Sequence, residues 1–460
     1  MSDYEESSFQ SFRQWFRESN TVKFATIGVL ILLLLYPVGL VSGLISEREQ
    51  ARDQVVRELS SKWGGEQAVA GPVLTVPFEV RTEIGENQYT TRMVKAHFLP
   101  KALNVDGTLD AKTRYRSIYE VLLYGSTLSF SGHFEKPDFE KLNVGTGRIR
   151  WDRAYVSLGL SDLTGIRDPI ELTIGGATHE FEPGLPDKQV LSSGVSVPVD
   201  LGEPRAYGPN APEVADSDET LAFEFDVKLN GRKKLHVVPV GKNTKMHLES
   251  DHGTPSFDGA FLPDSRTIDE NHFSADWSVL DLNRSFPQQW IKNEYDISAS
   301  SFGVQLLVPV DHYQKADRSV KYALLFIVLT FTVFFFAEVL NDNRIHPIQY
   351  MMVGGGLCVF YILLVAISEH IGFNLAFLIA STGVIGLITG YSKSVLRDGA
   401  LTTIVGTALV ALYVFLFTVL QLEMYALLIG SIGLFVVLGA VMYLSRNVNW
   451  YRAMSRDGNV

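Results

Sequence analysis

Cysteine is almost absent from this chain of 460 residues, in which Cys358 is the only one. A disulfide or a paired-cysteine metal motif needs at least two cysteines, so both are excluded within the chain. Cys358 lies in a long apolar run, where we expect it to pack as a small apolar side chain. Any large domain of this protein must therefore be stabilised by its hydrophobic core alone.

Basic residues are too few for a nucleic-acid-binding protein. The chain carries 40 Lys and Arg against 51 Asp and Glu, which gives a formal net charge of −11. This balance supplies no basic surface for phosphate groups, so we expect no nucleic acid among the partners. Catalytic motifs are missing too, because the sequence contains no nucleophile elbow, phosphate-binding glycine loop or zincin motif. We predict that the protein is not an enzyme and uses no cofactor.

Long apolar runs, by contrast, are abundant. A helix needs roughly 20 apolar residues to cross the ~30 Å hydrocarbon core of a bilayer. Such runs form helices in lipid, because a helix satisfies all its backbone polar groups internally. We therefore predict six transmembrane helices surrounded by the lipid bilayer. The six runs are Phe24 to Leu44, Lys321 to Leu340, Ile348 to Ile367, Gly372 to Tyr391, Ala400 to Leu420 and Met424 to Leu444.

Lys and Arg in the short connections predict the orientation, because positively charged loops stay in the cytoplasm. The connections at 368–372 and 421–423 contain neither Lys nor Arg, which places them outside. Arg48, Arg52 and Arg57 argue the other way, but they begin a long translocated segment, to which the charge rule applies weakly. We predict both termini in the cytoplasm. The basic residues on that side are Arg13, Arg17, Lys23, Arg344, Lys393, Arg397, Arg446, Arg452 and Arg456.

The segment between the first and second runs has the composition of a soluble domain. Val55, Leu59 and Trp63 repeat at a spacing of four, which predicts a helix that continues from the first run and ends at Gly64. After it the apolar period changes to two, so we predict an antiparallel, sandwich-like β domain. The predicted strands lie within residues 70–80, 116–134, 154–160, 170–176, 221–231, 235–241 and 302–313.

The predicted fold class is therefore a membrane α-helical protein with six transmembrane helices and a large β-rich, sandwich-like outer domain. The predicted parts are a cytoplasmic segment (1–23), an anchor helix (24–45), the β-rich domain (46–318), a five-helix bundle (319–445) and a cytoplasmic tail (446–460).

Ionisable and polar residues beside the apolar runs are the candidate functional sites, because charge in a membrane is costly unless it lies at a boundary or has a role. Glu369 and His370 fall in an outer turn, where we expect them to cap a hairpin and Glu369 to face water or the β-rich domain. A proton or ion relay, and thus a small-molecule or ion translocator, is the alternative. Arg344 is near enough in sequence to pair with Glu338. The full set of candidates is Glu369, His370, Asn374, Glu338, Arg344, His346 and Gln349.

The stretch "HLESDH" offers a second alternative, a metal-dependent enzyme. On a strand, His247, Glu249 and Asp251 share one face, and His252 follows directly. The sequence shows no further histidine at a diagnostic spacing, so a polar turn explains the stretch equally well, and we expect no metal.

Several stretches resemble the CreD family of bacterial inner-membrane proteins. They include "KWGGEQAVAGPVLTVPF", "PSFDGAFLPDSR" and "HPIQYMMVGGGLCVFYILLVAISEHIGFNLAFLIA", and the resemblance runs nearly end to end. The resemblance implies a multi-pass protein of the inner (cytoplasmic) membrane, with its large domain in the periplasm and a role in cell-envelope integrity or envelope stress tolerance. It implies no catalytic residues. We expect action through periplasmic contacts, with periplasmic or membrane protein partners that the sequence does not name.

Overall fold

The structure is a computed structural model that describes residues 20–446, apart from several short segments. The segments excepted are 86–87, 117–118, 143–145, 189, 209–219, 292–294, 307–311, 341–344 and 423–424. The chain folds as two compact units. The helical unit comprises residues 1–52 and 310–460, and the β unit comprises residues 53–309.

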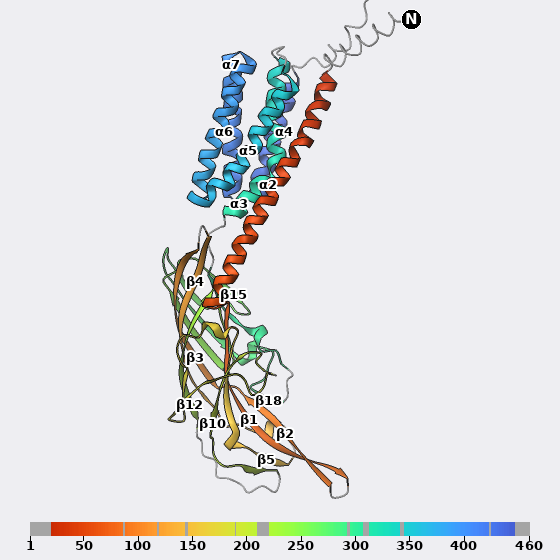
Figure 1. The fold of residues 1–460 in the computed structure, drawn as a ribbon. Helices are drawn as coiled ribbons and strands as arrows, with labels where there is room; N and C mark the ends of the chain where they lie inside the picture. The colour runs from red at the N-terminus through yellow and green to blue at the C-terminus, as the bar shows by residue number, and fades with distance from the viewer. Residues whose placement is uncertain are drawn as a thin grey trace, which may run out of the picture. The chain divides into compact units, whose positions relative to one another are not determined.

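Seven α-helices lie in the described part of the chain (Figure 1). They are α2 (Asn20–Trp63), α3 (His312–Lys321), α4 (Ala323–Leu340), α5 (Pro347–Ile371), α6 (Phe373–Leu396), α7 (Gly399–Gln421) and α8 (Ala426–Ser445). Five of the described helices, α2, α5, α6, α7 and α8, are long and apolar enough to cross a membrane. The pair α3 and α4 passes the same test together, with a bend of 49° between its members. Counting this pair as one span gives up to six, in agreement with the prediction.

Helix α2 runs without a break from the first apolar run to the predicted stop. Its last residue is Trp63, and Gly64 follows with a φ of +138°, a conformation that glycine tolerates and other residues resist. The Gly64 N–H still donates to the Ser60 carbonyl over 2.8 Å, as in the helix, and the positive φ of Gly64 then turns the chain out of it. The predicted helix end is confirmed.

Helix α3 replaces the end of a predicted strand. The strand predicted over 302–313 ends at Leu306, and His312 already belongs to α3. Tyr313, Ala316 and Val320 are buried on one face of this short helix. Their spacing of three and four is helical, but it covers too few residues to stand out beside the preceding strand.

Helix α5 approaches α2 closely at Gly354. A Cβ placed on Gly354 would lie 2.2 Å from Leu34 Cδ1 on α2 and 3.1 Å from Phe331 Cζ on α4. A Cβ on the neighbouring Gly355 would have nothing within 4 Å. The absence of a side chain at Gly354 therefore lets the three helices pack together, as small residues do in membrane bundles.

The β unit contains two sheets. Its strands are β1 (Gln67–Gly85), β2 (Gln88–Phe98), β3 (Ala102–Arg116), β4 (Tyr119–Phe134), β5 (Gly147–Ile149), β6 (Ala154–Leu160), β7 (Glu171–Ile174), β8 (Ala177–Glu180), β9 (Glu182–Pro183), β10 (Gly194–Val199), β11 (Arg205–Tyr207), β12 (Leu221–Arg232), β13 (Lys234–Val238), β14 (Asn243–Ser250), β15 (Pro255–Gly259), β16 (Ser265–Ile268), β17 (Phe273–Leu280), β18 (Gln289–Ile291) and β19 (Phe302–Leu306). The larger sheet has the order β15-β19-β13-β1-β6-β10-β9, with β2, β5, β11 and β18 paired beside it. The smaller sheet has the order β16-β17-β14-β3-β4-β12-β7-β8.

Buried side chains of both sheets form one hydrophobic core. Val69 and Val76 from the larger sheet belong to the same buried cluster as Leu103 and Val105 from the smaller. In the smaller sheet, β3 and β12 alternate buried apolar and exposed polar residues, the pattern of a sheet with one buried face, whereas β6 of the larger sheet is buried throughout. The predicted β-rich, sandwich-like domain is thus confirmed.

Strand direction differs from the prediction at two places. β1 pairs in parallel with β13, with Gln67 opposite Leu235, and β3 pairs in parallel with β14, with Asn243 opposite Ala102. The prediction of an antiparallel domain is therefore wrong at these two pairs, although the other described strand pairs are antiparallel. Alternation of apolar and polar residues is the same in both directions, so the pattern did not show that strands far apart in the chain pair in parallel.

His97 on β2 gives the β unit an expected acid sensitivity. The side chain is 2% exposed, its Nδ1 lies 3.0 Å from Thr75 Oγ1, and burial lowers its pKa from the usual 6.5 to about 4. Below pH 6.5 the unfolded chain therefore binds a proton that the folded unit does not. As the pH is lowered, the free energy of unfolding of the β unit should fall by roughly 1.4 kcal/mol per pH unit. Between pH 6.5 and pH 5 the loss is about 2 kcal/mol.

Urea unfolding of the full chain, followed by tryptophan fluorescence at pH 7 and pH 5, would measure this loss. His97→Gln cannot titrate, so the pH 7 to pH 5 difference should shrink by about 2 kcal/mol in that variant. An equal pH difference in the wild type and the variant would contradict the assignment to His97.

Candidate functional site

Of the predicted site residues, Glu338 of α4 lies in a buried ionic cluster, whose other members, Lys23 of α2 and Tyr350 of α5, were not among the candidates. Glu338 is 3% exposed. Lys23 Nζ of α2 lies 2.8 Å from its Oε1, and the Tyr350 hydroxyl of α5 donates to its Oε2 over 2.9 Å. The predicted partner, Arg344, lies outside the described residues. The sequence analysis had used Lys23 only to orient the chain, and no local pattern links it to a residue 315 positions away.

His346 and Gln349 cap helix α5. The His346 N–H donates to Gln349 Oε1 over 2.8 Å, and the Ile348 N–H donates to His346 Nδ1 over 3.3 Å. Pro347 occupies the first turn, where its missing N–H costs nothing. These contacts satisfy backbone groups that a helix end otherwise leaves unpaired. Both candidates therefore have a structural role.

Glu369, at the other end of α5, is bonded to neighbouring helices. Its side chain is 12% exposed, accepts a hydrogen bond from the Tyr313 hydroxyl over 2.9 Å and lies 3.8 Å from Arg48 Nε of α2. Arg52 lies over the Tyr313 ring, 5.9 Å from its centroid. Of the two surroundings expected for Glu369, water is wrong, because Tyr313 of α3 and Arg48 of α2 lie against it. The other, the β-rich domain, stays a prediction. His370, beside Glu369, is exposed.

Asn374 belongs to a neighbouring polar chain. Its Oδ1 accepts from Gln421 Nε2 of α7 over 2.5 Å, and Gln421 Oε1 accepts from Lys315 Nζ of α3 over 3.0 Å. These bonds tie α3, α6 and α7 together at the same end of the helical unit as Glu369.

The two polar clusters lie at opposite ends of α5. Tyr350 and Glu369 are 19 positions apart in this helix, which is ~28 Å at a rise of 1.5 Å per residue. This length is close to the thickness of the hydrocarbon core. Both clusters thus lie at the expected boundaries of a membrane, where they join α2 to the other helices.

The residues of "HLESDH" have separate partners. His247 Nδ1 lies 2.7 Å from Asp276 Oδ1, and His272 Nδ1 lies 3.8 Å from Asp251 Oδ1. His252 Nε2 lies 2.8 Å from the Thr254 hydroxyl. A search of the described residues finds no group of three or more His, Cys, Asp or Glu that could hold a metal ion.

Ser301, His236 and Asp258 contact one another in the order of a serine hydrolase triad. His236 Nε2 lies 2.6 Å from Asp258 Oδ1, and its Nδ1 lies 3.4 Å from Ser301 Oγ. His236 and Asp258 both stand opposite Gly303 of β19, so the imidazole crosses a strand that has no side chain there. His236 is 1% exposed, and burial lowers its pKa.

A hydrolase triad needs a space in which a substrate reaches the nucleophile. Neither of the two cavities described in the β unit is lined by Ser301, His236 or Asp258. We therefore assign these residues to a buried link between β13 and β15, which satisfies the polar atoms of His236.

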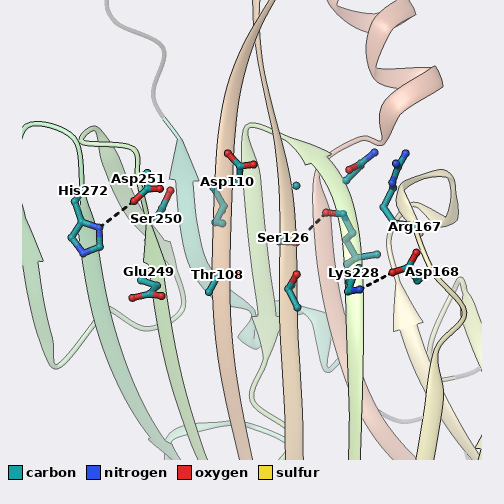
Figure 2. Close-up of a pocket in the computed structure, with 15 residues that line it drawn as sticks. Thr108, Asp110, Ser126, Arg167, Asp168, Lys228, Glu249, Ser250, Asp251 and His272 are labelled. Carbon is teal, nitrogen blue, oxygen red and sulfur yellow. Dashed lines mark hydrogen bonds and ion pairs between the residues drawn. The ribbon is translucent and has the colours of Figure 1, made fainter.

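An open groove of about 520 Å³ crosses one face of the smaller sheet (Figure 2). Four of its residues stand directly opposite one another on neighbouring strands. Glu249 of β14 pairs with Thr108 of β3, Thr108 with Thr127 of β4, and Thr127 with Lys228 of β12. Strands lie about 4.8 Å apart, so the backbones of Glu249 and Lys228, at the two ends of this row, are ~14 Å apart.

Charge is distributed unevenly along the groove. Figure 2 shows Asp251 and His272 beside Glu249 at one end, and Arg167 and Asp168 beside Lys228 at the other. Lys228 Nζ pairs with Asp168 Oδ2 over 2.8 Å, which lowers the pKa of that carboxyl. The groove therefore has an acidic end and an end with net positive charge.

Gly125 forms part of the groove next to this row, where it stands between Asp110 and Asn230 on the neighbouring strands. A Cβ at Gly125 would have only Asn230 Oδ1 near it, at 3.7 Å. The position is open, so a side chain added there would fill the groove and displace nothing.

From the sequence, Glu249 was considered only as a ligand in the metal-dependent alternative, and the groove was missed. Thr108 and Thr127 are about a hundred residues or more from Lys228 and Glu249, and only strand register brings the two pairs together. Small hydroxyl residues alternate on the polar face of β4, which is compatible with a groove floor. An ordinary solvated face of a sheet shows the same alternation, so the pattern did not predict the groove.

Comparison with known proteins leads to the family that the motifs resemble. The family model described as "Inner membrane protein CreD" matches residues 19–451. The inner membrane protein CreD of Escherichia coli (strain K12) is 32% identical over 428 residues, which cover 92% of this chain and 91% of that relative. These matches confirm the resemblance.

Proposed function

Because this chain belongs to the CreD family of inner-membrane proteins, we propose that it supports the integrity of the bacterial cell envelope without catalysing a reaction. In this proposal the β unit lies in the periplasm and acts by contact with envelope components or partner proteins. The observation that carries the proposal is the open groove on the smaller sheet, which offers polar and charged groups to a ligand. The helices anchor the β unit to the membrane.

The distribution of basic residues supports this sidedness. Lys393 and Arg397 lie at the end of α6, and Arg446 follows α8. The connection between α5 and α6 has neither Lys nor Arg. Cytoplasmic loops carry the excess of positive charge, so the connection between α6 and α7 belongs in the cytoplasm and the β unit on the other side.

The alternative function, a small-molecule or ion translocator, depends on Glu369 and His370. A relay needs a carboxylate that exchanges its proton with a pathway. Glu369 instead accepts a hydrogen bond from Tyr313 and lies close to Arg48. These contacts favour a role in holding the helices together. We therefore prefer the β unit as the functional part.

Chemical blocking of the groove from outside the cell would test the proposal. Thr127→Cys, in a Cys358→Ala background, places one thiol in the groove. Treatment of intact cells with a membrane-impermeant methanethiosulfonate should modify it and abolish complementation of a deletion strain exposed to envelope-directed agents. Ser131→Cys, on the same face of β4 but outside the groove, should be modified without loss of function.

Ser394→Cys, exposed at the cytoplasmic end of α6, controls for sidedness and should not react in intact cells. Full complementation by a completely modified Thr127→Cys protein would contradict the role of the groove. Reaction of Ser394→Cys from outside would contradict the orientation.

A further inference from the structure

We propose that the groove binds a short, extended, peptide-like zwitterion, with its ammonium at the Glu249 end and its carboxylate at the Lys228 end. This inference rests on the proposed function, since it names the ligand class of the same site. Three features of the groove carry it: opposite charges at its ends, the distance between them, and the small polar residues along its floor.

The acidic end has a carboxylate to offer. Among the described residues Glu249 takes part in no ion pair, and it is exposed. Asp251 has a side chain that is 98% exposed, and His272 Nδ1 lies 3.8 Å from its Oδ1. An ammonium group placed here would gain charge-assisted hydrogen bonds, which are stronger than neutral ones.

The opposite end selects an anion. Among the residues that line this end of the groove, Lys228 and Arg167 carry two positive charges and Asp168 one negative charge, so the lining has one positive charge in excess. Arg167 is exposed, and its guanidinium lies over the Trp63 ring, 5.8 Å from the centroid. A guanidinium presents a planar pair of donors that matches a carboxylate.

The floor between the two ends suits an extended chain. Thr108 and Thr127 supply hydroxyl groups that donate and accept hydrogen bonds, as a peptide backbone requires. In the next row across the sheet, Gly125 has no side chain and so leaves space between Asp110 and Asn230. The ~14 Å between Glu249 and Lys228 matches four residues in extended conformation, at about 3.4 Å per residue.

Tetra-alanine with free termini is the probe, and its affinity for the purified full-length protein would be measured by isothermal titration calorimetry. Acetylation of its N-terminus and amidation of its C-terminus should each weaken binding about tenfold, since each removes one charged contact. Gly125→Val should abolish binding by filling the groove. Ser131→Val, a matched change outside the groove, should leave the affinity unchanged.

The affinity of each variant for each modified peptide shows which end of the groove binds which terminus of the peptide. In Glu249→Gln, N-acetylation should cost less than twofold, while C-amidation should still cost about tenfold. Arg167→Gln should show the reverse pattern. Lys245→Gln, on the same face but outside the groove, should respond to both modifications as the wild type does.

Equal binding of the free and end-blocked peptides, or no binding of tetra-alanine to the wild type, would overturn the ligand class. The proposed function would survive that result if modification of Thr127→Cys still abolished complementation. If that modification were harmless while tetra-alanine bound as expected, the proposed function would fail and the ligand class would stand.

Discussion

Replacement of Glu338 by alanine is expected to destabilise the helical unit by about 3 kcal/mol. The change leaves Lys23 without its carboxylate and removes the acceptor of the Tyr350 hydroxyl. Removal of one partner of a buried ion pair costs roughly 3–5 kcal/mol, and Lys23, 30% exposed, places the effect at the lower end. Unfolding in mixed micelles by SDS titration would measure the change.

Lys23→Met provides the control for this prediction. Removal of both charges leaves no unpaired charge, and only the Tyr350 hydroxyl still lacks its acceptor, so Lys23→Met with Glu338→Ala should recover at least half of the lost stability. If the two single losses simply add in the double variant, the Lys23–Glu338 contact does not exist in the folded protein.

Gly354→Leu should separate α2 from α5. The new Cβ would lie 2.2 Å from Leu34 Cδ1, so the helices must move apart or repack. Overpacking of this kind costs about 1–3 kcal/mol, or more where backbone must shift. The same SDS titration would report it.

Gly355→Leu is a matched control one position away, where nothing lies within 4 Å of the new Cβ. It should be neutral or slightly stabilising, since leucine forms helices better than glycine. Equal losses in the two variants would show that Gly354 does not face α2.

Local patterns in the sequence predicted where helices and strands lie better than they predicted which strands pair and in which direction. The apolar runs gave the spans, and Gly64 gave the end of α2, because length and backbone freedom are properties of short segments. The parallel pairing of β3 with β14 was missed, since alternation is independent of strand direction.

The same limit applies to the candidate sites. Glu338 and Glu369 were candidates because each lies beside an apolar run, but their partners Lys23 and Arg48 are more than 300 residues away and could not be inferred. His346 and Gln349 form a capping box whose spacing of three was visible in the sequence. The groove was not visible, because the row from Glu249 to Lys228 exists only through the register of four strands.

The central claim is that the function of this protein resides in the groove of the β unit and that the polar clusters of the helical unit are structural. Complementation of a deletion strain by Gly125→Val and by Glu369→Gln, at matched protein abundance, tests it most directly. Glu369→Gln retains an acceptor for Tyr313 and weakens a half-exposed contact with Arg48 that is worth no more than about 1 kcal/mol, so it should complement fully. Gly125→Val fills the groove and should fail, while complementation by Gly125→Val together with failure of Glu369→Gln would contradict the claim.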